Sequence, residues 1–103
     1  MKVTLRVLSG PHVGRAFTFE QHDTFLIGRS DTAHLCLPDD RFFSRNHCIL
    51  EINPPRCFLR DLGSTNGTFV NRGRRLLPGK RQMLQSGDEI IVGKTFLKFQ
   101  VLR

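Results

Sequence analysis

The 103-residue sequence contains no tryptophan and no tyrosine, and it has no apolar run long enough to cross a membrane. Its longest apolar clusters, such as TFLIG and EIIVG, have the length of single strands. Helical periodicity is also nearly absent, because glycine, proline or Asn-Gly interrupts the apolar positions. The first residues alternate as KVTLRVL, which predicts a strand rather than a signal peptide. We therefore expect a cytoplasmic protein, or a nuclear one if the source is eukaryotic, with no membrane contact.

Cysteine and histidine are too few and too scattered to predict a metal site. Cys36, Cys48 and Cys57 form no CxxC motif, and an odd number of cysteines cannot all pair within one chain. We expect buried free thiols in a reducing compartment. The four histidines lack the spacing of metal ligands. The sequence therefore predicts no metal and no cofactor.

Catalytic motifs are missing as well. Ser44 and His47 match two residue types of a hydrolase, but no orienting acid and no G-x-S-x-G elbow accompany them. Neither a suitable pair of carboxylates nor a phosphate-binding P-loop is present. We expect no catalytic residues, and a function other than that of an enzyme.

What the sequence does contain is a series of short apolar runs between turn residues. Such a series is typical of an all-β sandwich, and 103 residues suit one domain, here residues 1–103. The expected strands are Val3 to Val7, Ala16 to Phe19, Phe25 to Gly28, Leu35 to Leu37, Cys48 to Ile52, Cys57 to Asp61, Thr68 to Val70, Met83-Leu84, Glu89 to Val92 and Phe96 to Leu102.

The central hairpin can be predicted in register. If Pro54-Pro55 forms the turn, Ile52 faces Cys57 and Leu50 faces Leu59. These side chains then share the core face of the hairpin. The opposite face carries Glu51 and Arg60.

Two polar stretches follow or precede these strands. IGRS ends an apolar strand in Gly28 and Arg29, a pair that also fits an ordinary solvated arginine. FFSRNHCIL places Ser44, Arg45 and His47 directly before a core strand. The same residues would suit a capped turn, with His47 as a structural histidine.

A third stretch, DLGSTNGTFVN, is unusually rich in hydrogen-bonding side chains. Asn66-Gly67 is a strong hairpin signal by itself. Ser64 and Thr65 are not needed for the turn, and their hydroxyls with the loop N–H groups can bind an anion or a peptide backbone.

Taken in order, GR, SRNH, DLGSTNGTFVN and LQSGDEIIVG resemble the forkhead-associated (FHA) domain family over essentially the whole chain. The resemblance implies an FHA/SMAD-like β-sandwich of about eleven short strands, with ligand loops at one end. It also implies a recognition module that binds phosphothreonine peptides and docks a phosphorylated partner in Ser/Thr-kinase signalling. Many members of the family form part of a larger protein, and we expect the same here.

The resemblance assigns roles to individual residues. Those at the family's phosphate-binding positions are Arg29, Ser44 and Arg45. Those in the peptide-binding loop are Ser64, Thr65 and Asn66, where Asn66 matches the asparagine that hydrogen-bonds the ligand backbone. Those at structural positions are Gly28, His47 and Gly67.

The residues before SRNH vary in the family and select the third ligand residue beyond the phosphothreonine. We expect Phe43 to turn into the core and Arg41 and Phe42 to lie near the ligand. An apolar or acidic ligand residue would suit them.

The chain is strongly basic, with 16 Lys and Arg against 9 Asp and Glu and a formal net charge of +7. This charge favours anionic partners, and NRGRRLLPGKR (residues 71–81) would suit a nucleic-acid backbone. Nucleic acid is nevertheless the less favoured partner, because stacking needs exposed aromatics and the Phe residues mostly alternate in core positions. A phosphate-independent interaction scaffold is a third hypothesis, against which the intact Arg29, Ser44 and Asn66 argue. As an isolated domain the chain is expected to be monomeric.

Overall fold

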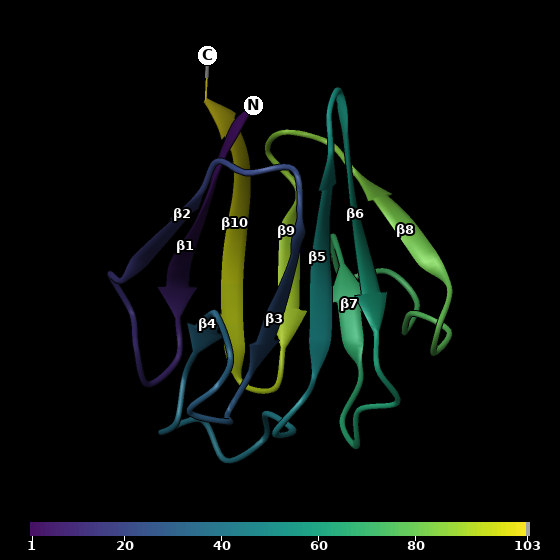
Figure 1. The fold of residues 1–103 in the computed structure, drawn as a ribbon. Coiled ribbons are helices and arrows are strands. Elements are labelled where there is room, and N and C mark those ends of the chain that lie inside the picture. Colours follow the sequence, from purple (N-terminus) through teal and green to yellow (C-terminus); the bar gives the residue numbers. More distant parts are fainter. Residues whose placement is uncertain (103) are drawn as a thin grey trace.

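The computed structural model describes residues 1–102, which form ten strands in two sheets packed face to face (Figure 1). The strands are β1 (Lys2–Ser9), β2 (Ala16–Phe19), β3 (Thr24–Gly28), β4 (Leu35–Cys36), β5 (Cys48–Asn53), β6 (Arg56–Asp61), β7 (Thr68–Val70), β8 (Arg81–Leu84), β9 (Glu89–Val92) and β10 (Thr95–Leu102). The prediction of an all-β sandwich is confirmed. The structure has ten strands over residues 1–102, whereas the family resemblance implied about eleven.

Each sheet has five strands. One has the order β2-β1-β10-β9-β7 and the other β4-β3-β5-β6-β8. The strand pairs are antiparallel, apart from the short parallel pair of β3 with β4. Within residues 1–102, no helix is long and apolar enough to span a bilayer.

The core lies between the sheets and follows from the alternation of each strand. In β5 and β6 the predicted hairpin register is confirmed, since Ile52 pairs with Cys57 and Leu50 with Leu59. All four side chains are buried. Removing one such aliphatic side chain from water is worth about 1.5–3 kcal/mol. The three cysteines are free, Cys48 and Cys57 in the core and Cys36 half-buried.

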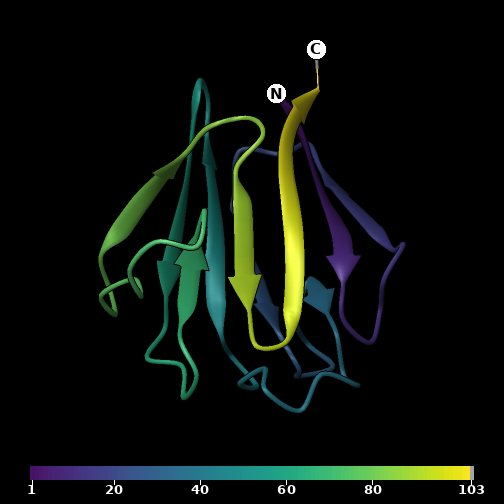
Figure 2. The same ribbon diagram turned by 180° about the vertical axis from the view of Figure 1, so that it is seen from behind.

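The two ends of the sandwich differ. β1 and β10 pair along their length, so that Lys2 lies opposite Leu102 and both chain ends leave the same end of the molecule. At the other end lie the β3–β4, β4–β5, β6–β7 and β9–β10 loops (Figures 1 and 2). These loops carry the polar motifs found in the sequence, so the fold gathers them on one surface.

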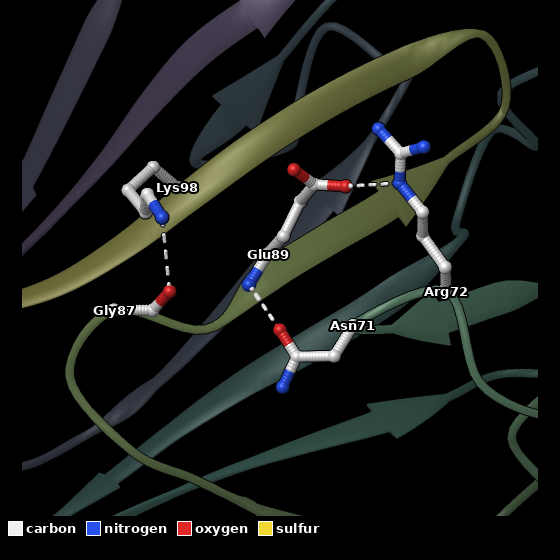
Figure 3. Close-up of polar contacts among 5 residues, drawn as sticks. All are labelled: Asn71, Arg72, Gly87, Glu89 and Lys98. Carbon is white, nitrogen blue, oxygen red and sulfur yellow. Dashed lines mark hydrogen bonds and ion pairs between the residues drawn. The ribbon is translucent and has the colours of Figure 1, made fainter.

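A segment of residues 71–80 crosses from β7, the edge of one sheet, to β8, the edge of the other. It starts with the turn Val70–Gly73, whose central residues Asn71 and Arg72 have φ of 52° and 58°. Two positive φ values are those of a type I′ turn. Asn71 Oδ1 accepts the Glu89 N–H at 2.9 Å, and Arg72 Nε donates to the Glu89 carboxylate at 3.0 Å (Figure 3). Lys98 donates to the adjoining β8–β9 turn. The turn is thereby fixed on β9.

Candidate functional site

The β3–β4, β4–β5 and β6–β7 loops enclose an open cavity of about 420 Å³. It is lined by Arg29, Arg41, Phe42, Phe43, Ser44, Arg45, Thr65 and Asn66. Seven of these eight were singled out from the sequence as ligand contacts, and Phe43 is buried in the core beneath them as expected. Three arginines and no acidic residue are among the described residues of the lining, so the cavity favours an anion.

Gly28 sets the distance between the first two loops. A Cβ at this position would lie 2.9 Å from the carbonyl carbon of Arg45 and closer still to its oxygen. The close approach allows the Arg29 N–H to donate to Ser44 O at 3.1 Å and the Ser30 N–H to Arg45 O at 3.1 Å. Arg29 is therefore held beside Ser44 and Arg45 by backbone contacts that only glycine permits.

His47 connects the second loop to the third from inside the molecule. Its ring is fully buried. Nδ1 accepts the Ser44 N–H at 2.9 Å, and Nε2 lies 2.9 Å from the Gly67 carbonyl oxygen. Because Nδ1 accepts, the ring proton lies on Nε2 and is donated to Gly67. Burial lowers the pKa of His47, which keeps the ring neutral.

The polar side chains that face the cavity are only partly engaged by the protein. Ser44 Oγ accepts the Thr65 N–H at 3.1 Å, which leaves its own proton for a ligand. Asn66 Nδ2 donates to the Phe42 carbonyl at 3.0 Å. Among residues 1–102 no donor is bonded to Asn66 Oδ1, so the amide oxygen can accept from a peptide N–H. The Arg29 and Arg45 side chains are exposed.

Ser64 is the predicted contact that the structure does not bring to the cavity. Its side chain is buried, its hydroxyl donates to Asp61 Oδ1 at 2.6 Å, and its Oγ accepts the Gly67 N–H at 3.0 Å. The hydroxyl therefore shapes the β6–β7 loop, and Ser64 is not among the residues that line the cavity. A serine in this loop suggested ligand binding from the sequence, but its hydroxyl is hydrogen-bonded to the nearby Asp61.

Asp61 is the centre of this loop, and sequence reasoning missed it. Its carboxylate accepts the N–H groups of Gly63 and Ser64, both at 2.9 Å, and the hydroxyls of Ser64 and Thr68 at 2.6 and 2.7 Å. Burial works to raise its pKa, but the hydrogen bonds of Ser64, Thr68 and Gly63 outweigh it and hold the pKa below the ordinary value. An aspartate at a strand end, with Gly and Ser two and three positions after it, was the available signal.

Asp40 is a second buried acid that the sequence did not single out. Its Oδ1 accepts the Phe42 N–H at 2.9 Å, and its Oδ2 accepts the Lys94 N–H at 2.8 Å and the Thr95 hydroxyl at 2.7 Å. It thereby ties the β4–β5 loop to the β9–β10 turn. The Lys94 ammonium lies 4.9 Å from the ring centroid of the half-exposed Phe42 and adds a further cation near the cavity.

Arg75 also holds the β6–β7 loop. Its Nη2 donates to the carbonyls of Ser64 at 2.6 Å and Thr65 at 3.3 Å. The side chain packs on Gly67, where a Cβ would lie 2.6 Å from Arg75 Nε. Gly67, with φ of 87°, therefore has two reasons to be glycine.

Comparison with known proteins identifies the family and several relatives of this chain. Residues 25–93 match the model of the FHA domain family. The oxoglutarate dehydrogenase inhibitor of Corynebacterium efficiens is 41% identical over 95 residues, which cover 92% of this chain and 63% of that protein. The glycogen accumulation regulator GarA of Mycolicibacterium smegmatis is 36% identical over 95 residues, covering 92% and 56%. The chain thus spans less than two-thirds of the length of these curated relatives.

Solved structures give the same result. One from a study of phosphothreonine-dependent FHA domain interactions has a TM-score of 0.83 and 31% identity, covering 100% of this chain and 99% of that one. The FhaA FHA domain, solved in complex with the intracellular domain of Rv3910, has a TM-score of 0.78 and 33% identity, covering 95% and 99%. This chain belongs to the forkhead-associated domain family.

Proposed function

We propose that this FHA domain binds a phosphothreonine-containing segment of a partner protein in Ser/Thr-kinase signalling. The observation that carries the proposal is the convergence of Arg29, Ser44 and Arg45 on one cavity whose described lining contains no acid. A phosphothreonine carries about −1.5 to −2 charges and three strong acceptor oxygens at neutral pH. The relative solved in a study of phosphothreonine-dependent interactions supports the same ligand class.

Each residue has a chemical role in this proposal. The planar guanidinium of Arg29 offers paired donors to the phosphate, Ser44 donates its free hydroxyl proton, and Arg45 supplies a second cation. Thr65 lies beside the phosphothreonine, and Asn66 accepts from the ligand backbone. Hydrogen bonds to a charged group are worth about 1.5–3 kcal/mol each. After the cost of ordering a short peptide, three or four of them correspond to an affinity of about micromolar.

Selectivity beyond the phosphate falls to Arg41 and Phe42, which line the same cavity. Phe42 is 46% exposed and is flanked by Lys94. An apolar ligand residue would pack on the ring, and an acidic one would pair with Arg41 or Lys94. We propose one of these two residue types at the third position beyond the phosphothreonine.

The proposed role is recognition without catalysis, and the named relatives are an inhibitor and a regulator. We further propose that residues 1–103 are one FHA domain of a larger signalling protein, since the chain matches only part of those relatives. Three free thiols support a reducing compartment, the cytoplasm.

Fluorescence anisotropy with a degenerate phosphothreonine peptide library tests the ligand class. Matched phosphoserine and unphosphorylated pools are measured beside it, on the wild type, on Arg29→Ala and on Arg6→Ala. Arg6 is also exposed but lies on β1, outside the cavity lining. We expect selective binding of the phosphothreonine pool, about a hundredfold loss in Arg29→Ala, and no loss in Arg6→Ala. Equal binding of all pools, or no binding, would overturn the proposal.

A further inference from the structure

A second cavity, of about 470 Å³, lies at the open side of the sandwich between β7 and β8. Its lining includes four cations and two leucines: Arg74, Arg75, Lys80, Arg81, Leu76 and Leu77. No acidic residue is among the described residues that line it. We call it the β7–β8 groove. It contains the basic run of the sequence that the phosphate site does not use.

Two of the four cations already have partners, and two do not. Arg75 is bonded to the β6–β7 loop. Arg81 lies 3.8 Å from the Glu51 carboxylate and 4.1 Å from the ring centroid of Phe58. Arg74 and Lys80 form no ion pair with residues 1–102, and both are exposed. The groove therefore presents charge that the rest of the domain leaves unneutralised.

Backbone contacts fix the shape of the groove. The Leu76 N–H donates to Thr68 O at 2.8 Å, and the Gly79 N–H donates to Asp61 O at 2.9 Å. Asn71 holds the start of the segment on β9 (Figure 3). Residues 71–80 are thus attached to both sheets, and a ligand would not need to order them first.

The groove also contains two leucines and lies next to β8, an edge strand of its sheet. Leu77 is 62% exposed beside the half-buried Leu76. β8 is the outermost strand of its sheet and pairs only with β6 within residues 1–102. The other edge of β8 has no partner strand among residues 1–102, and extended peptides can add a strand at such an edge.

We propose that the β7–β8 groove is a second docking surface, which binds an extended acidic segment of a partner protein without any phosphothreonine. In an extended segment successive side chains point to opposite sides. Acidic residues alternating with leucine-like residues can therefore meet Arg74 and Lys80 with one set and the two leucines with the other. This site goes beyond the phosphothreonine site and does not depend on it.

Other occupants fit the groove less well. Single-stranded nucleic acid gains affinity by stacking on exposed aromatics. Here the apolar part of the described lining is aliphatic, namely Val70, Leu76 and Leu77, and Arg81 lies over the ring of Phe58. A second copy of this chain carries the same net charge of +7 and would be repelled.

Anisotropy with a fluorescein-labelled, unphosphorylated nine-residue peptide of alternating Glu and Leu tests the proposal. The test variant is Arg74→Glu/Lys80→Glu. The control is Arg6→Glu/Arg56→Glu, which changes the net charge equally at exposed positions outside the groove. We expect the test variant to bind at least about tenfold more weakly than wild type, and the control to bind like wild type. Leu77→Ser, a change at an exposed position, should also weaken binding. Circular dichroism verifies the fold of each variant.

Four results would overturn the proposal. One is the absence of binding to the wild type, and another is an equal loss in test and control variants, which would show a general charge effect. The third is displacement of the Glu-Leu peptide by a saturating phosphothreonine peptide, which would place it in the other cavity. A ten-nucleotide oligothymidine that binds the wild type more tightly than the peptide, and is lost in Arg74→Glu/Lys80→Glu, would assign the groove to nucleic acid instead. Retained peptide binding in the presence of phosphothreonine peptide would support two separate sites.

Discussion

Substitutions of His47 should separate two contacts that the histidine makes at once. Nδ1 holds the backbone of Ser44, and Nε2 holds that of Gly67. An asparagine places its amide oxygen near the Nδ1 position and can keep the Ser44 contact. A glutamine reaches the Nε2 position and can keep the Gly67 contact. An alanine keeps neither.

The structure sets the size of the effect. A buried donor or acceptor left unpaired costs about 1–3 kcal/mol. His47→Ala strands two such groups and leaves a gap beside Phe43, whose ring centroid lies 5.5 Å away. We expect it to lose about 4 kcal/mol of unfolding free energy, and His47→Asn and His47→Gln about 2 kcal/mol each. In a domain of this size 1 kcal/mol lowers Tm by about 4–8 °C.

The pH dependence provides a second measurement on the same variants. Because burial lowers the pKa of His47, the folded state holds the ring neutral while the unfolded state takes up a proton below about pH 6.5. The contribution of neutral His47 to the free energy of unfolding is therefore complete above pH 6.5. It is lost as the pH falls toward the lowered pKa. The free energy of unfolding then changes with pH by at most about 1.4 kcal/mol per pH unit because of His47. This slope should be absent from the Asn and Gln variants.

Urea unfolding between pH 7.5 and 5, followed by far-ultraviolet circular dichroism, measures both effects, since the chain has no Trp or Tyr for fluorescence. Phosphopeptide affinity measured at 10 °C shows the consequence for the site. If the alanine variant were as stable as the asparagine and glutamine variants, the two hydrogen bonds would not carry the energy assigned to them. An unchanged pH slope in all three would show that His47 is not held neutral.

Two further predictions concern the loops on either side of His47. Gly28→Ala should cost about 2–3 kcal/mol of stability and more than tenfold in phosphopeptide affinity, because the added Cβ pushes Arg45 away from Arg29. The control is Gly14→Ala, at a position with φ of 93° and open space around it. This variant should be strained but should bind the phosphopeptide normally. Equal affinity losses in both would contradict the close-approach argument. Asp61→Asn should lose about 2–4 kcal/mol at pH 7 in urea unfolding, because a charged acceptor of four hydrogen bonds is replaced. Since the Asp61 pKa is lowered, the wild type keeps this advantage above about pH 3.8 and loses it at lower pH, so a difference that persisted unchanged at pH 2 would argue against it.

Local signals in the sequence were enough to predict most of the strands and the register of the central hairpin. Alternation marks the buried face of a strand, and the Pro54-Pro55 turn sets the register of Leu50 against Leu59. The residues that line the cavity of the β3–β4, β4–β5 and β6–β7 loops belong to motifs that follow a known order. Their separate origins on three loops show why no single motif was sufficient.

Contacts between distant segments were beyond sequence reasoning. Asp40 receives the Lys94 N–H across 54 positions, and nothing local marks either residue. Arg75 belonged to a basic run, and its bond to the Ser64 carbonyl depends on how the chain crosses the open side. The bond of the Ser64 hydroxyl to Asp61 was not predicted for a related reason, since the direction of a hydroxyl depends on its nearest acceptor. The contacts of these three residues follow from tertiary packing, and residue type alone does not predict them.

The pairing of Lys2 with Leu102 places the two chain ends side by side, at the end away from the recognition loops. Residues across an antiparallel pair have Cα atoms about 4.5–5.5 Å apart. A surface loop of an unrelated host protein could thus be opened between two neighbouring residues and receive residues 2–102, with hardly any strain on the host. The cavity of the β3–β4, β4–β5 and β6–β7 loops would point outward from such a chimera, and with the proposed phosphothreonine binding the host could report on kinase activity.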